Sequence, residues 1–346
     1  MRVKFLESRT YEEALKISNA RIDDAKKLWD VYTKEKGDKW LVYRACPFCG
    51  NDDYSLMEKF HNRYGIARCR HCNSLYVNPC PNQEALNDYY NNYMCNSMLE
   101  DVYRKRANKS KSAILDERVL TITKYIKKIE RKKIRILEVG CSNGSFLKKL
   151  QDHLDRDKSI NSSFELYGVD TNGNAISSCS DPNLILYTDT AEHFLETTDL
   201  TFDIIWHAEL VEHIIDPYSL FHKMYTKMNH NSYMIFTTPN DYSLEMKNIS
   251  YNVPRVLACN VFPPMHLNAF SVTNVTSFVL RNDFCIEEIS TPGNFDMEIF
   301  EMEKEYISDD FILSLIEFEE EQKEIYQNLI KKCGGSSHLQ CVVSKR

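Results

Sequence analysis

One stretch of the chain decides its fold, Ile134-Arg-Ile-Leu-Glu-Val-Gly-Cys-Ser-Asn-Gly-Ser-Phe-Leu147. Its first half is an apolar run that predicts a buried strand over 134–139, and its second half predicts a helix from 145 onward. Gly140 and Gly144 fall in the turn between the two. Since glycine has no Cβ, a ligand can approach the backbone closely there.

The same rhythm of strand, turn and helix continues along the chain. Apolar runs predict further strands over 165–169, 184–187, 202–206 and 233–237, with a helix at 220–228 before the last of these. Alternation of this kind is typical of a parallel sheet covered by helices on both faces. Two final strands are expected at 284–290 and 338–345, separated by an acidic helical insertion over roughly 298–332.

A carboxylate follows the second predicted strand, in Tyr167-Gly-Val-Asp170. An acid at this position of a nucleotide-binding sheet can accept hydrogen bonds from both hydroxyls of a ribose. The polar stretch 152–163, read as a loop, accounts for its long separation from the glycine turn.

Cysteines form two pairs ahead of this region, Cys46-Pro-Phe-Cys49 and Cys69-Arg-His-Cys72, with nineteen residues between the pairs. Each pair can place two thiolates on one tight turn, and two such turns make a closed tetrahedral zinc site. A segment this small cannot build much hydrophobic core, so a metal can supply its folding energy. The pattern predicts a structural zinc ribbon over 41–80.

Composition agrees with an ordinary globular chain of 346 residues, 43 % hydrophobic and 27 % charged. We expect a helical segment over 1–40, the zinc ribbon over 41–80, a helical lid or linker over 81–130 and the catalytic domain over 131–346. With no apolar run long enough for a membrane span and no secretory signal, a cytoplasmic location is expected. The net charge of −7 argues against a large nucleic-acid surface. The oligomeric state stays open.

Four motifs together resemble class I S-adenosylmethionine-dependent methyltransferases over roughly 131–290. They are Glu138-Val-Gly-Cys-Ser-Asn-Gly144, Gly168-Val-Asp170, Phe202-Asp-Ile-Ile-Trp-His-Ala-Glu-Leu-Val-Glu-His213 and Thr238-Pro-Asn240. The resemblance implies a Rossmann-like α/β fold, a seven-stranded sheet whose last strand runs antiparallel, here preceded by the zinc ribbon and helical segments. Ser142 stands where the family usually has its middle glycine.

The resemblance also implies residues that bind S-adenosylmethionine. The methionine end would lie against the turn, the ribose on Asp170, the adenine near Thr190 or Ala191, and the sulfonium near His207 and Glu209. The turn residues concerned are Glu138, Gly140, Cys141, Ser142 and Gly144.

Three histidines are candidates for chemistry at the acceptor. His266 lies in Pro263-Pro-Met-His-Leu-Asn-Ala-Phe-Ser271, which resembles a stretch in small-molecule and sugar methyltransferases where the histidine faces the acceptor. We expect it to act as general base or acceptor ligand, or else as a residue that begins a helix. His207 is a second catalytic candidate, and His213 is expected to brace the fold.

A zinc module ahead of such a domain also resembles sugar methyltransferases that act on nucleotide-linked deoxysugars. We therefore expect a small polar acceptor, a sugar or glycan intermediate, with methylation on oxygen favoured over carbon. Two alternatives stay open: an RNA or tRNA methyltransferase that grips phosphates with the ribbon, and a scaffold whose methyltransferase domain has lost activity.

Overall fold

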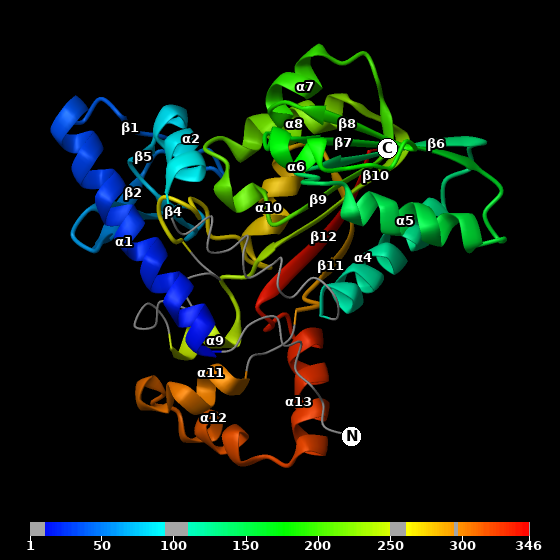
Figure 1. Cartoon of the computed structure of the whole chain (residues 1–346). Helices are drawn as coiled ribbons and strands as arrows, with labels where there is room; N and C mark the ends of the chain where they lie inside the picture. Colours follow the sequence, from blue (N-terminus) through cyan, green and yellow to red (C-terminus); the bar gives the residue numbers. More distant parts are fainter. Residues whose placement is uncertain (1–10, 94–109, 250–260, 294–296, 346) are drawn as a thin grey trace.

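The computed structural model describes residues 11–93, 110–249, 261–293 and 297–345 (Figure 1). Parts of the segments 1–40 and 81–130 lie outside the described residues. Within the described part of the chain, no helix is both long and apolar enough to cross a bilayer.

A seven-stranded sheet forms the centre of the molecule. Its strands are β6 (Lys133–Val139), β7 (Ser163–Asp170), β8 (Leu184–Thr188), β9 (Phe202–Ala208), β10 (Met228–Pro239), β11 (Cys285–Ser290) and β12 (His338–Lys345). Their spatial order is β11-β12-β10-β9-β6-β7-β8, and β12 alone runs antiparallel to its neighbours in this sheet. The predicted Rossmann-like fold with an antiparallel last strand is confirmed.

Helices cover both faces of this sheet. Successive side chains of a strand point to opposite faces, and here both faces carry apolar side chains that need cover. Ile134 and Ile136 of β6 point to one face, where α4 (Ser110–Ile126) and α5 (Ser145–Arg156) pack. Leu137 and Val139 point to the other face, toward the second group of helices. That group comprises α7 (Ala191–Thr197), α8 (Pro217–Thr226) and α10 (Asn274–Arg281).

Three short elements complete the turns near the carboxyl ends of the parallel strands. They are α6 (Gly173–Ser177), the 3-10 turn η1 (Val211–His213) and α9 (Leu244–Asn248). The insertion before β12 folds as α11 (Met297–Met302), η4 (Lys304–Tyr306), α12 (Asp310–Ser314), η5 (Leu315–Glu317) and α13 (Glu320–Lys332). It forms a small apolar core with α9 and projects away from the sheet in Figure 1.

The amino-terminal part is built around short strands. They are β1 (Leu41–Val42), β2 (Tyr54–Phe60), β3 (Tyr64–Cys69), β4 (Leu75–Val77) and β5 (Cys80–Pro81). We call residues 41–81 the cysteine module. The long helix α1 (Tyr11–Lys36) and α2 (Gln83–Asn92) pack on it, and residues 261–269 share the same apolar core.

The cysteine module also packs directly on the sheet's helices. Phe48, between two of the cysteines, is fully buried and lies edge-on to Phe270 at 4.9 Å and to Phe278 of α10 at 6.2 Å. The segment after residue 266 extends β4, because Val77 N donates to Leu267 O and Ala269 N donates to Leu75 O. The module and the sheet therefore share one continuous core.

This shared core predicts the effect of Phe48→Ala. Removing a fully buried phenylalanine should lower the free energy of unfolding by about 3–5 kcal/mol. The matched control is Phe311→Ala, since Phe311 is 64 % exposed, and it should change the value by about 0.5 kcal/mol or less. Urea denaturation followed by circular dichroism measures both. Equal effects of the two substitutions would show that the module does not share the core.

Candidate functional site

The polar side chains of the site gather where the parallel strands end. Strand order reverses between β6 and β9, because the chain moves outward through β7 and β8 and then returns to the other side of β6. In open α/β sheets ligands bind beyond the carboxyl ends of the strands at such a reversal, and we call this region of the edge the crevice. Since β12 is antiparallel, its first residue, His338, lies at this same edge, opposite Pro239.

The turn from β6 into α5 forms one wall of the crevice. Gly140 (φ 78°) and Gly144 (φ 72°) have left-handed backbones, and so does Ser142 (φ 51°). Gly140 N and Cys141 N both donate to Val169 O, which fixes the turn against β7. Serine thus tolerates the conformation that glycine would adopt more cheaply.

Asp170 stands at the end of β7 beside this turn. One carboxylate oxygen accepts from Ser142 N and the other from Asn172 N, both at 2.8 Å. A carboxylate has about four acceptor sites. Two of them are therefore left for a ligand, while the backbone holds the side chain in place.

Glu138 lies at the end of β6, on the face that carries α4 and α5. It is 6 % exposed, and its Oε2 has no hydrogen bond within the described residues. Burial raises the pKa of Glu138 well above its ordinary value, although Arg118 of α4 and Trp206 act in the opposite direction. An orphaned buried oxygen of this kind is expected to meet a donor from a ligand.

The end of β8 places the predicted adenine-side residues beside Asp170. Asp189 N donates to Asp170 O, and Asp189 also binds His193 with 2.6 Å between Oδ2 and Nδ1. Thr190 caps α7 by accepting from His193 N, and Ala191 is the first residue of that helix. These contacts bring the glycine turn, Asp170 and Thr190 to one side of the crevice.

Glu209 opens the other side of the crevice, just beyond β9. Its Oε1 accepts from Thr237 Oγ1 at 2.9 Å, and its Oε2 lies 3.5 Å from Nε2 of His338. Desolvation alone would raise the pKa of Glu209, but His338 and Arg118 lower it to about 2. Desolvation likewise opposes the charge on His338, yet Glu209 raises the pKa of that histidine. Each of the two side chains therefore favours the charged form of the other.

Glu212 and His213 follow on η1. Glu212 is 2 % exposed and accepts through Oε2 from Thr238 Oγ1 at 2.8 Å, so consecutive threonines of β10 hold Glu209 and Glu212. Burial raises the pKa of Glu212 well above its ordinary range, with repulsion from Glu209 adding to the effect. Burial lowers the pKa of His213 to about 4, so its imidazole is neutral near pH 7.

His266 lies against His213, with ring centroids 4.9 Å apart and an interplanar angle of 70°. It is 6 % exposed and sits in a tight turn in which its backbone N–H and C=O both bond to Phe262 at 2.9 Å. The next residue, Leu267, donates its N–H to Glu212 O at 2.7 Å. The turn that carries His266 is thus fastened to η1.

His207 lies elsewhere. Ile204 and Trp206 of β9 face α4 and α5, so the alternation turns His207 to the opposite face. Its ring is fully buried, stacked on Phe236 at 5.0 Å and edge-on to Phe221 at 5.6 Å. Burial lowers its pKa to about 3. This core position does not favour the catalytic and sulfonium-side roles expected for His207, because the aromatic rings of Phe236 and Phe221 enclose it.

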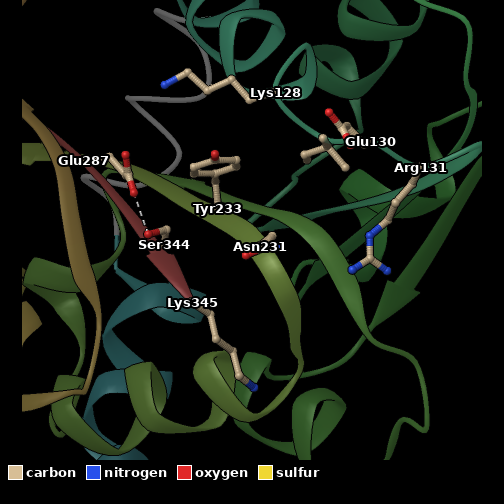
Figure 2. A pocket seen from close by; sticks show the side chains of 9 residues that line it. Lys128, Glu130, Arg131, Asn231, Tyr233, Glu287, Ser344 and Lys345 are labelled. Atoms are coloured by element: carbon tan, nitrogen blue, oxygen red, sulfur yellow. Dashed lines mark hydrogen bonds between the residues drawn. The ribbon is translucent and has the colours of Figure 1, made fainter.

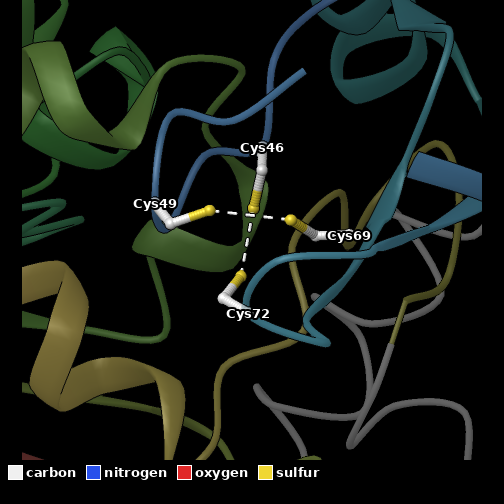
Figure 3. Close-up of side chains that lie close together, drawn as sticks. All are labelled: Cys46, Cys49, Cys69 and Cys72. Carbon is white, nitrogen blue, oxygen red and sulfur yellow. Dashed lines mark hydrogen bonds between the residues drawn. The ribbon is translucent and has the colours of Figure 1, made fainter. Parts of the chain in front are cut away.

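The four predicted metal cysteines meet in space (Figure 3). The sulfur atoms of Cys46 and Cys72 are 3.5 Å apart and those of Cys49 and Cys69 are 3.6 Å apart. All four lie within 4.8 Å of one another. Thiolates on one tetrahedral zinc ion lie about 3.8 Å apart when the bonds are about 2.3 Å. The cluster has the donors and the spacing for such an ion.

A separate hollow of about 490 Å³ lies at the opposite edge of the sheet (Figure 2). It is bordered by Lys128, Glu130, Arg131, Tyr233 and Lys345, near the start of β6 and the end of β12. Its walls contain none of the residues described above, and we assign it no part in the chemistry.

Comparison with known proteins bears directly on the domain described here. Residues 111–274 match a family model described as a methyltransferase domain. The matched residues include the glycine turn and the strands β6 to β10. A match to this family indicates an enzyme that transfers methyl groups. No curated protein matches the chain.

Solved structures with a similar fold include several methyltransferases. One is a SAM-dependent methyltransferase from Archaeoglobus fulgidus, 19 % identical, with a TM-score of 0.41 over 67 % of this chain and 94 % of that one. Another is the plantazolicin methyltransferase BamL, solved with a triazolic analogue and SAH, 16 % identical, with a TM-score of 0.46 over 72 % and 91 % of the two chains. Likenesses at this level do not identify the acceptor.

Sequence reasoning missed two residues of the candidate site. Arg118 reaches it from α4, a helix we had expected to belong to a lid or linker, and His338 reaches it from the start of the antiparallel strand. The only signal for His338 was its position at the head of a predicted final strand. Arg118 carried no signal, since basic residues are common on solvated helix faces.

Proposed function

We propose that this enzyme transfers a methyl group to a hydroxyl oxygen of a small polyhydroxylated acceptor, a sugar or glycan intermediate. The observation that carries the proposal is the division of the crevice into two halves. The glycine turn, Glu138 and Asp170 lie on one side. The other side holds a group of carboxylates, imidazoles and threonine hydroxyls, which belong to Glu209, Glu212, His213, His266, His338, Thr237 and Thr238. An acceptor with several hydroxyl groups can satisfy many such buried polar atoms at once.

The first half fits S-adenosylmethionine. Glu138 has a buried oxygen that can accept from the ammonium group of the methionine portion. The turn that contains Cys141, with left-handed backbone at Gly140, Ser142 and Gly144, gives that portion room. Asp170 keeps acceptor sites for both ribose hydroxyls, and Thr190 and Ala191 lie where the adenine would follow. When bound, the cofactor supplies an electrophilic methyl group on sulfur.

The second half fits the acceptor. Methyl transfer is an in-line displacement, and most of the acceleration comes from holding the nucleophile against the methyl carbon. We place the acceptor hydroxyl against His266, which either takes its proton or holds the oxygen in line. Glu209, kept ionised by His338, is positioned between this group and the cofactor half, where a negative charge favours a sulfonium.

We assign one structural zinc ion to Cys46, Cys49, Cys69 and Cys72. Four thiolates close the coordination shell, so the ion has no open position for substrate. The loop between Cys46 and Cys49 directs the side chain of Phe48 into the core, where it packs against Phe278 of α10. This inward direction favours a bracing role over the phosphate grip that an RNA-binding ribbon would need.

Loss of the ribose contact should weaken cofactor binding. Asp170→Ala removes two charge-assisted hydrogen bonds, so the Kd for S-adenosylhomocysteine should rise about 10- to 100-fold. Asp199→Ala, which removes an exposed carboxylate, is the control and should leave the Kd unchanged. Isothermal titration calorimetry of the zinc-loaded protein measures both. An unchanged Kd for Asp170→Ala would exclude this ribose site.

Loss of His266 should abolish acceptor chemistry while the cofactor still binds. His266→Ala should lower the rate of methyl transfer by about 10²-fold or more, the contribution typical of a positioned base or ligand. His222→Ala, on the exposed side of α8, should retain the wild-type rate.

The assay follows formation of S-adenosylhomocysteine with a panel of nucleotide sugars and oligosaccharides. Unchanged affinity for S-adenosylhomocysteine and an unchanged melting temperature establish that the variant is folded. A folded His266→Ala enzyme within about threefold of the wild-type rate would contradict the role of this residue. Methylation of RNA and of no saccharide would overturn the acceptor class.

A further inference from the structure

Glu212, His213 and His266, which we call the Glu-His-His cluster, bring together the ligand set of a metal site. One ligand atom from each residue can be chosen so that all three lie within 4.8 Å of one another. Glu212 and His266 are almost fully buried, whereas 22 % of the His213 side chain is exposed. The cluster is therefore enclosed by protein and open on one side.

Hydrogen bonds to residues outside the Glu-His-His cluster orient the ring of His213. Nδ1 of His213 lies 2.9 Å from Met265 O and 3.0 Å from the hydroxyl of Tyr90. A carbonyl accepts only, so Met265 O can hold a proton on Nδ1, and Nε2 lies 3.5 Å from Glu212 Oε1. Metal-binding histidines typically donate their second nitrogen to a carbonyl in this way.

Glu212 shows the same arrangement. Its Oε2 accepts from Thr238 Oγ1, and its Oε1 is buried without a hydrogen bond within the described part of the chain. Burying a carboxylate oxygen costs several kcal/mol unless a donor or a cation compensates it. Without a cation, a proton held between Oε1 and the ring nitrogen of His213 would offset the charge of Glu212, and a bound metal ion would take the place of that proton.

The backbone holds the three ligands on two tightly joined turns. Besides the bond from Leu267 N to Glu212 O, the amide of Asn268 donates to Ile214 O at 2.8 Å and to Val211 O at 3.2 Å. A metal site needs its ligands held by such supporting contacts before the ion arrives. In a tetrahedral site with bonds of about 2.1 Å, ligand atoms lie about 3.4 Å apart, so side-chain rotation alone can close the cluster.

We propose that Glu212, His213 and His266 bind a divalent first-row transition-metal ion whose open positions hold the hydroxyl of the methyl acceptor. The inference rests on the proposed function, since it assigns His266 the ligand role rather than the base role there. Two imidazoles and one carboxylate suit Zn²⁺, Co²⁺, Fe²⁺ or Mn²⁺ better than Mg²⁺. Three protein ligands leave a position for substrate, unlike the closed set of four cysteines.

The ion explains how an alcohol becomes a nucleophile in this crevice. Coordination lowers the pKa of a hydroxyl strongly. The proton of the acceptor hydroxyl passes to solvent as the oxygen–carbon bond forms and the carbon–sulfur bond breaks. One proton and one molecule of S-adenosylhomocysteine then leave for each methyl transferred. A second hydroxyl on the neighbouring carbon could occupy another open position, which would favour vicinal diols.

Cobalt(II) is the probe that separates this site from the cysteine site. Tag-free protein is first loaded with one equivalent of zinc, which the four thiolates retain, and is then titrated with Co²⁺ alone by calorimetry and visible absorption. We expect one further equivalent to bind with ligand-field bands and without thiolate-to-cobalt charge-transfer bands. Glu212→Gln preserves the shape and the bond to Thr238, and it should weaken Co²⁺ binding at least about tenfold, as should His266→Ala.

Two controls separate the possible failures. Asp170→Ala should bind Co²⁺ as the wild type does, and His222→Ala should match the wild type in every measurement. With S-adenosylhomocysteine bound normally, absence of a second metal equivalent, or equal Co²⁺ affinity in wild type and Glu212→Gln, would overturn the metal site and leave His266 as a base. Failure of the wild type to bind S-adenosylhomocysteine would instead overturn the proposed function.

Removal of the second ion with zinc retained should abolish methyl transfer, and full activity without it would contradict the proposal.

Discussion

A partly buried guanidinium joins the two parts of this protein. Arg44, just ahead of the first cysteine, donates to the carbonyl oxygens of Val77 and Leu267 and also to that of Ile215. Burial lowers the pKa of Arg44, and a charge taken out of water is tolerated only where hydrogen bonds replace its hydration. The three carbonyls belong to the cysteine module, to the turn that carries His266 and to the loop after η1. The acceptor half of the crevice depends on this junction.

The junction gives the cysteine module a role beyond its own stability. A four-cysteine zinc site would fix the loops around Phe48 and Cys69, and these loops pack against α10 and the segment leading to it. That segment pairs beside β4 through Asn268. His266, two residues earlier in the chain, lies against His213. In this account the sheet supplies the cofactor half of the site, and the module positions the acceptor half.

Much of this could be predicted from the sequence because the deciding signals are local. The glycine turn, the carboxylate ending β7 and the paired cysteines each lie within a few residues, and the order of strands predicted the sheet that is observed. His207 shows where local reasoning fails. Strands buried on both faces read as continuous apolar runs, so the sequence does not reveal which face a given side chain takes. The meeting of Glu212, His213 and His266 depends on a junction between distant segments, which no local pattern contains.

A crystal structure of the zinc-loaded enzyme with S-adenosylhomocysteine tests the central claim most directly, namely that one crevice joins a cofactor half to an acceptor half built with the cysteine module. The account predicts the ribose hydroxyls on Asp170, the amino group near Glu138, and the sulfur directed toward Glu209 and the Glu-His-His cluster. A ligand bound elsewhere, or one whose sulfur faces away from that cluster, would contradict it.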